Sequence, residues 1–200
     1  MSSNSLFDSK RDFWENQHQK KDTYWLTGSS AQNVLRYHGN PPISGIILDI
    51  GIGMARFMKD ISKTHTIMGV DISPEAVKRG SQYGDCFLVD QLSSVPPVDW
   101  AFCHLVFQHC SDEIVQKIID EVPLKPGGIF SFQFAYINPG ETPTDFLKTV
   151  LAQGQHYLRD ETRMNEILTK TSKRIVKVAN RVSFHHPENL SWSIYQVTNR

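Results

Sequence analysis

The stretch LDIGIGMAR, residues 48–56, decides the fold class of this chain. It continues an apolar run that starts at Ile46, as expected of a central strand buried on both faces, and it leads into residues with apolar side chains at helical spacing. Gly51 and Gly53 permit a sharp turn with positive φ and let a ligand approach the backbone closely. The sequence therefore predicts a strand, a glycine turn and a helix N-terminus in direct succession.

Short apolar runs alternate with amphipathic stretches from Ile43 onward, which is typical of a parallel sheet covered by helices on both faces. Pro126-Gly127-Gly128 is expected to form a tight turn into the fifth strand. The expected strands are residues 46–50, 66–71, 86–90, 98–104 and 129–134, with helices at 54–63, 73–83 and 111–122. Helices at 144–156 and 159–171 follow, and a β-hairpin of residues 175–184 and 191–198 is expected to close the chain.

Composition narrows the classes of protein that this chain could represent. Its 200 residues have the length of one domain, and 21 Lys and Arg balance 21 Asp and Glu, so no basic surface for nucleic acid is expected. No apolar stretch reaches the ~20 residues that span a bilayer, and no secretory signal is recognised, so we expect a cytoplasmic protein. The three cysteines have no paired spacing and are expected to be reduced thiols.

Two classes of cofactor compete for the glycine turn. A dinucleotide favours a third glycine at the position of Arg56, and the carboxylate of Asp49 would repel its pyrophosphate. The same carboxylate would attract the ammonium group of S-adenosylmethionine. Asp71, 20 residues beyond Gly51, closes the second expected strand and can accept hydrogen bonds from ribose hydroxyls in either class. The turn therefore favours S-adenosylmethionine over a nicotinamide cofactor.

Four segments together resemble the class I S-adenosylmethionine-dependent methyltransferases of the small-molecule type, in order and in spacing. They are LDIGIGMARF (48–57), GVDISPEAVKRG (69–80), VPPVDWAFCHLVFQHCSDE (95–113) and LKPGGIFSF (124–132). The resemblance implies one α/β domain with a Rossmann-like, mostly parallel, seven-stranded sheet of order 3-2-1-4-5-7-6, helices on both faces and an antiparallel last strand. Within it, residues 1–42 would form a helical lid region, 43–136 the cofactor-binding core and 137–200 the closing helices and hairpin.

The resemblance also implies which residues hold the cofactor. Asp49, Gly51 and Gly53 would contact its methionine end, Asp71 the ribose and Ile72 the adenine. The adenine amino group would be hydrogen-bonded by an acid that follows the third strand. Asp90, together with Gln91, fits this position better than Asp85. Ala55 departs from the family, which often has a glycine there.

The candidate catalytic residues are two histidines near the end of the fourth expected strand. His104 closes that strand, at the edge where open α/β sheets bind ligands, and His109 follows in the loop. The ordinary histidine pKa of ~6.5 suits a general base, although each residue could instead be a structural hydrogen-bonding group. His18, His185 and His186 are weaker candidates, and no metal site is expected because the His185-His186 pair has no third ligand. Phe13, Trp14, Tyr24 and Trp25 could form either a lid or core packing.

The leading hypothesis is transfer of a methyl group from S-adenosylmethionine to oxygen or nitrogen of a small molecule. A protein that binds S-adenosylmethionine without transferring methyl, as a regulator or partner subunit, is the alternative, and a nicotinamide-dependent oxidoreductase is third. The sequence does not name the acceptor, and it leaves the oligomeric state open.

Overall fold

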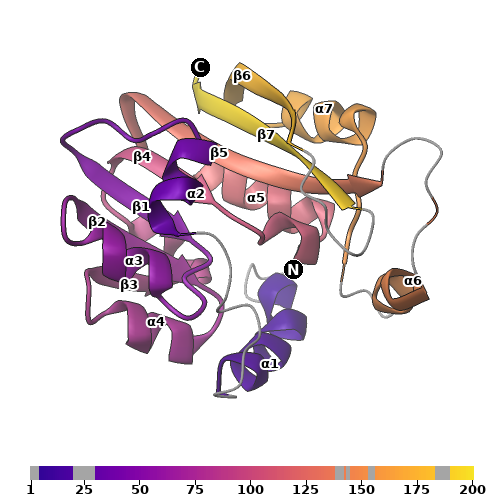
Figure 1. Cartoon of the computed structure of the whole chain (residues 1–200), viewed down its shortest axis with the longest axis horizontal. Coiled ribbons are helices and arrows are strands. Elements are labelled where there is room, and N and C mark those ends of the chain that lie inside the picture. The colour runs from indigo at the N-terminus through magenta and orange to yellow at the C-terminus, as the bar shows by residue number, and fades with distance from the viewer. Residues whose placement is uncertain (1–4, 20–29, 138–141, 143–144, 153–155, 183–189) are drawn as a thin grey trace.

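The protein has an α/β fold in which helices pack against a central sheet (Figure 1). The computed structural model describes residues 5–19, 30–137, 142, 145–152, 156–182 and 190–200. Its seven-stranded sheet has the order β3-β2-β1-β4-β5-β7-β6. All neighbouring pairs are parallel except β5 with β7 and β7 with β6. The predicted fold class and strand order are confirmed. The strands are β1 Ile46–Ile50, β2 Thr66–Asp71, β3 Asp85–Leu88, β4 Val98–Cys103, β5 Leu124–Ile137, β6 Lys173–Val182 and β7 Leu190–Asn199.

Helices cover both faces of the sheet because the central strands are apolar on both sides (Figure 1). One buried cluster joins the sheet to α1, α5 and α7, and a second joins it to α2, α3 and α4. The helices are α1 Ser5–Gln19, α2 Ala31–Tyr37, α3 Arg56–Ile61, α4 Pro74–Gly80, α5 Asp112–Glu121, α6 Asp145–Ala152 and α7 Glu161–Thr169, with 3₁₀ turns η2 Val89–Ser94 and η3 Phe107–His109. None of the helices in the described ranges is both long and apolar enough to cross a membrane.

Three local expectations are corrected by the structure. β5 runs through Pro126-Gly127-Gly128 instead of starting after it; Gly127 has φ of 78°, and the pairing with β4 passes from Leu124, opposite Val98, to Ile129, opposite Trp100. Asp90 lies in η2 rather than at the end of a strand. Helix α3 begins at Arg56 instead of Met54, because Ala55 has a left-handed backbone.

Candidate active site

Asp49 lies inside the sheet, one residue before the end of β1. Its side chain is 1% exposed, and Oδ2 has no hydrogen-bond partner among the described residues. Burial raises the pKa of this carboxyl well above its ordinary value, the nearby Asp71 acts in the same direction, and Arg56 opposes both. A buried, ionised carboxylate without a partner is costly, so Asp49 favours the protonated form unless a cation or a hydrogen-bond donor binds beside it.

The glycine turn after Asp49 is shaped by positive φ angles. Gly51 has φ of 93°, and a Cβ at this position would lie 2.2 Å from Cγ2 of Val106. Gly53 has φ of 53°, which other residues rarely adopt. Ala55, where the family often has glycine, also has a left-handed backbone, with φ of 57°. Its methyl group fits in the core, at 2% exposure, so the cost of the departure is backbone strain.

Asp71 is the last residue of β2, and its carboxylate bridges the glycine turn and the segment that follows β2. Its Oδ2 accepts a hydrogen bond from the Gly53 N–H at 2.9 Å, and its Oδ1 accepts one from the Ser73 N–H at 2.9 Å. Burial raises the pKa of Asp71, although the charge of His18 and these N–H groups lower it. A carboxylate has about four lone-pair sites, so Asp71 keeps capacity for ligand hydroxyls. Ile72 follows it, partly buried against the core.

The two candidate acids for the adenine amino group, Asp85 and Asp90, lie at opposite ends of β3. Leu88 pairs with Asp71, so Asp90 lies just past that edge of the sheet, whereas Asp85 is exposed at the start of β3. Asp90 forms an ion pair with Arg11 at 2.9 Å. The side chain of Gln91 turns back, and its Oε1 accepts a hydrogen bond from the Leu88 N–H. Asp90 is therefore the acid that shares an edge with Asp71.

His104 lies at the end of β4, next to the glycine turn. Ile50 pairs with Cys103, so Gly51 and His104 follow at adjacent strand ends. Burial lowers the pKa of His104 to about 4, and the charge of Arg56 acts in the same direction. The expected base with an ordinary pKa is thus replaced by an imidazole that stays neutral throughout the physiological range.

His104 belongs to a polar cluster that crosses from α2 to β5. Its Nδ1 lies 3.2 Å from Nε2 of His38, whose Nδ1 lies 2.9 Å from Oγ of Ser131. On the same strand, Gln133 is 2% exposed and its Oε1 has no hydrogen-bond partner among the described residues. Sequence reasoning missed all three: His38 and Gln133 lie outside the four segments of the resemblance, and Ser131, within LKPGGIFSF, carries no assigned role there.

His109 has a different environment, in the turn η3. Its ring lies 4.8 Å from that of Trp14 and 4.5 Å from that of His156, measured between centroids. Both neighbours meet it at a steep angle. This packing between α1 and the segment before α7 fits the structural interpretation of His109.

Helix α1 crosses the residues expected to hold the cofactor. Besides the pair of Arg11 with Asp90, Glu15 accepts hydrogen bonds from the Ser73 hydroxyl and the Glu75 N–H. Nε2 of His18 lies 4.0 Å from the point where a Cβ on Gly53 would stand. In the sequence, His18 is only a weak candidate, and no pattern singles out Arg11 or Glu15.

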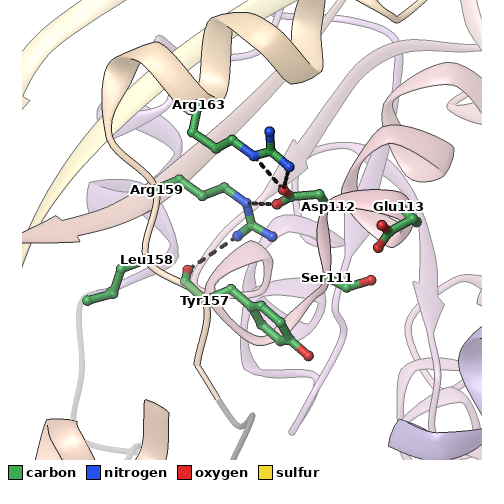
Figure 2. A pocket seen from close by; sticks show the side chains of 7 residues that line it. All are labelled: Ser111, Asp112, Glu113, Tyr157, Leu158, Arg159 and Arg163. Carbon is green, nitrogen blue, oxygen red and sulfur yellow. Dashed lines mark hydrogen bonds and ion pairs between the residues drawn. The ribbon is translucent and has the colours of Figure 1, made fainter. Parts of the chain in front are cut away.

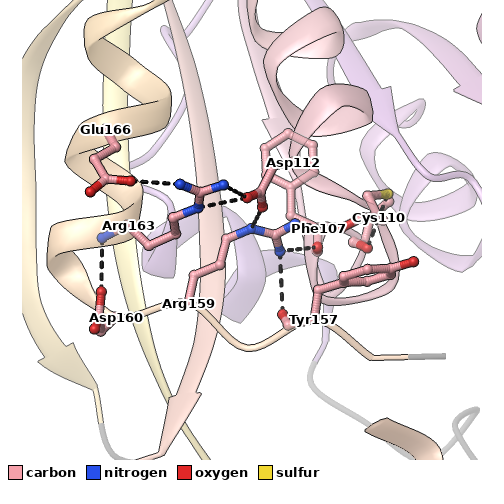
Figure 3. A network of polar contacts seen from close by, with 9 residues as sticks. Phe107, Cys110, Asp112, Tyr157, Arg159, Asp160, Arg163 and Glu166 are labelled. Carbon is pink, nitrogen blue, oxygen red and sulfur yellow. Dashed lines mark hydrogen bonds and ion pairs between the residues drawn. The ribbon is translucent and has the colours of Figure 1, made fainter. Parts of the chain in front are cut away.

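A buried arginine fixes the loop that carries His109. The guanidinium of Arg159 donates to Asp112 at 2.7 Å and to the carbonyls of Phe107, Cys110 and Tyr157 (Figure 3). Arg163 pairs with the same carboxylate from the surface. A hollow of about 410 Å³ lies beside this network, lined by Ser111, Asp112, Glu113, Tyr157, Leu158, Arg159 and Arg163 (Figure 2). Its two arginines are paired with Asp112, so we interpret it as part of the loop anchor.

Four of the candidate residues lie outside the described part of the chain: Tyr24, Trp25, His185 and His186. Among the residues that the structure describes, no three His, Cys, Asp or Glu side chains are grouped to hold a metal ion. The three cysteines are free thiols.

The model of a methyltransferase domain family matches residues 48–132, which include the glycine turn, Asp71, Asp90 and both candidate histidines. Residues 48–132 of this chain are therefore similar to a methyltransferase domain. S-adenosylmethionine or S-adenosylhomocysteine is bound in solved structures that have this fold. Among curated proteins, none matches the chain by sequence.

Solved methyltransferase structures share the fold of this chain. The N-methyltransferase NodS of Bradyrhizobium japonicum, with bound S-adenosylhomocysteine, has a TM-score of 0.69 at 18% identity, and the match covers 96% of this chain and 99% of that one. Geranyl diphosphate C-methyltransferase of Streptomyces coelicolor has a TM-score of 0.69 at 9% identity, with 99% of both chains covered. Phosphoethanolamine N-methyltransferase 2 of Haemonchus contortus has a TM-score of 0.64 at 15% identity; the match covers 94% of this chain but 56% of that one. This chain therefore spans little more than half of the last protein.

The residues of the candidate site fit S-adenosylmethionine. The unpartnered Oδ2 of Asp49 matches the need of an ammonium group for an anionic acceptor. The glycine turn exposes backbone next to it, and Asp71 and Asp90 line the same edge as acceptors for hydroxyl and amino groups.

Proposed function

We propose that this protein transfers a methyl group from S-adenosylmethionine to nitrogen or oxygen of a small molecule at the edge formed by β1, β2 and β4. The observation that carries this proposal is the buried, unpartnered carboxylate of Asp49 at the glycine turn, within a methyltransferase domain. Small-molecule acceptors named for similar structures, such as phosphoethanolamine and geranyl diphosphate, support the acceptor class. The cytoplasmic location and the exclusion of nucleic acid stay predictions.

In this proposal the described residues hold the cofactor by three kinds of contact. Asp49 pairs with the ammonium group, Asp71 accepts the ribose hydroxyls, and Asp90 accepts from the adenine amino group beside Ile72 and Gln91. Gly51 and Gly53 leave the backbone open to the methionine end. S-adenosylmethionine supplies an activated methyl group on a sulfonium.

His104 is the proposed general base. Its low pKa limits which chemical classes of methyl acceptor can give up a proton to it. A base with a pKa of about 4 is neutral at pH 7 but weak, so it cannot readily take a proton from an aliphatic alcohol. It can take one from a methylated amine or from an acidic hydroxyl such as a phenol. The unpartnered Oε1 of Gln133 could accept a second N–H or O–H of the same molecule. His109 then has a structural role.

Calorimetry with S-adenosylmethionine tests the cofactor site. Asp71→Ala should weaken binding by about 10- to 100-fold, since hydrogen bonds to a charged group contribute ~1.5–3 kcal/mol. Asp85→Ala is the matched control, because it removes an acid from the other end of β3, and it should bind as the parent does. Equal affinity of the parent and a folded Asp71→Ala protein would refute the ribose assignment.

Turnover tests the reaction itself. Formation of S-adenosylhomocysteine is measured with a panel of amines, phenols and aliphatic alcohols, and the first two classes are expected to react. His104→Gln should lower kcat by at least ~100-fold at every pH from 6 to 9, whereas His109→Gln should lower it by only a few-fold. Tight binding without turnover on any acceptor would favour the regulatory alternative.

A further inference from the structure

The ring of His104 has two nitrogens with different surroundings. Nδ1 faces Nε2 of His38 at 3.2 Å, so Nε2 is the nitrogen left for the methyl acceptor and for the neighbouring Gln133 side chain, which raises the pKa of the ring. A neutral imidazole carries one N–H and one lone pair, and the hydrogen bond made by one nitrogen sets the state of the other. The partner on Nδ1 therefore decides whether Nε2 can accept a proton.

Two arrangements satisfy the chain of Ser131, His38 and His104 when both rings are neutral. In the first, His104 Nδ1–H donates to His38 Nε2, and His38 Nδ1–H donates to the Ser131 oxygen. In the second, the Ser131 hydroxyl donates to His38 Nδ1, and His38 Nε2–H donates to His104 Nδ1. Only the first leaves a lone pair on His104 Nε2, so only the first permits His104 to act as a base.

We propose that His38 is a positioning residue which holds His104 in the tautomer with the proton on Nδ1, leaving Nε2 to receive the proton of the methyl acceptor. The inference rests on the proposed function of His104. As the methyl group leaves sulfur and bonds to the acceptor nitrogen or oxygen, the acceptor's N–H or O–H bond breaks and its proton passes to His104 Nε2. The resulting imidazolium keeps its Nδ1–H donated to His38.

The surroundings of the two rings fit this role. His38 is 0% exposed, and burial, followed by the neighbouring His104, lowers its pKa well below the ordinary value, so it is neutral and can accept. The groups that face His104 are Tyr37 and His38 from α2, Arg56 and Phe57 from α3, and Gln133 from β5. No carboxylate is among these neighbours; the positive charge of Arg56 lowers the pKa of His104, whereas the Gln133 side chain raises it and so favours the imidazolium that the step forms.

Nitrogen-15 NMR of histidine-labelled protein, with S-adenosylhomocysteine added, reports the tautomer directly. The His104 signals, identified by their loss in His104→Gln, should show a protonated Nδ1 in the parent. His38→Leu should shift His104 toward the Nε2–H form, whereas His38→Gln, whose side-chain oxygen can accept from Nδ1–H, should retain the parent tautomer. A parent with Nε2–H, or a tautomer unchanged in His38→Leu, would overturn the proposal.

Two further variants separate this effect from loss of packing. Ser131→Ala removes the far end of the chain and should give a mixture of tautomers even if His38→Leu does not fold. Thr198→Val removes another buried hydroxyl, which donates to the Gly128 carbonyl, and should leave His104 unchanged. A parent-like His104 tautomer in Ser131→Ala, or the same shift in Thr198→Val, would contradict the proposed hydrogen-bond chain from Ser131 through His38 to His104.

Kinetics give a second readout. His38→Leu should lower kcat by at least 10-fold with KM for S-adenosylmethionine within about 2-fold, and His38→Gln should restore most of it. Equal kcat in the parent and His38→Leu, or no rescue by glutamine, would contradict the role. The NMR measurement needs no turnover, so the two hypotheses are tested independently. An inactive parent would refute the proposed function, and the NMR spectra would still confirm or refute the His104 tautomer.

Discussion

Asp49 is buried without a partner for Oδ2, so replacing it should act in opposite directions on the free protein and on the complex. Asp49→Asn keeps the shape but removes the charge. We expect the melting temperature of the ligand-free protein to rise, because burial disfavours the ionised carboxylate. Binding of S-adenosylmethionine should weaken by about 10- to 100-fold, the loss of a charge-assisted hydrogen bond. Thermal melts with and without S-adenosylmethionine measure both effects.

Asp99→Asn is the control at residue scale. Asp99 is also a carboxylate next to the sheet, but it accepts from Lys125 and from the Ile46 N–H. These contacts, the one with Lys125 foremost, hold the pKa of Asp99 below its ordinary value, so its removal should lower the melting temperature and leave cofactor binding unchanged. A lower melting temperature with unchanged binding in Asp49→Asn would show that this carboxylate is structural.

The segment before α7 is held to the loop before α5 by one buried side chain. Arg159→Met should lower the free energy of unfolding by about 3–5 kcal/mol, because it leaves Asp112 and three carbonyls without their buried donor. Arg163→Met breaks a contact of the same carboxylate at the surface and should have a much smaller effect. Urea unfolding of both variants measures the difference, and equal losses would show that the buried guanidinium is not the anchor.

The stability of the whole molecule should depend on pH through its buried histidines. The pKa values of His38 and His104 are lower in the folded protein than in the unfolded chain, so the unfolded chain binds more protons between about pH 6.5 and 4. Stability should therefore fall as the pH falls through this range. His104, shifted from 6.5 to about 4, accounts for roughly 3 kcal/mol of the loss. Urea unfolding from pH 8 to 4.5 measures the slope.

Buried carboxylates act with the opposite sign, so the comparison of variants decides the origin of the slope. The raised pKa values of Asp49 and Asp71 mean that the folded protein binds protons more readily there than the unfolded chain does. His104→Gln should flatten the loss at low pH. A slope identical to that of the parent would place the titrating groups elsewhere.

The residue patterns by themselves determined the α/β class and the frame of the cofactor site, and the strand order followed from the resemblance to a known family. The signals were local: an apolar run before Gly51, an acid at the end of β2, and alternation of strands with helices. Each depends on residues next to one another in the chain, and the rules of parallel sheets then bring the strand ends together. The positions of Asp49, Asp71 and His104 at one edge follow from this.

Only the tertiary structure decided what surrounds those residues. His38 and Ser131 are 93 residues apart, and His38 and His104 are 66 apart. Their hydrogen-bond chain exists only because α2 packs on β4 and β5. The low pKa of His104 and the unpartnered Oδ2 of Asp49 likewise come from burial, which depends on helices distant in sequence. The register shift between Leu124 and Ile129 depends on pairing with β4, so a motif typical of turns became part of a strand. Local patterns fix where the chain turns, but desolvation and hydrogen-bond partners are set by segments that meet only after folding.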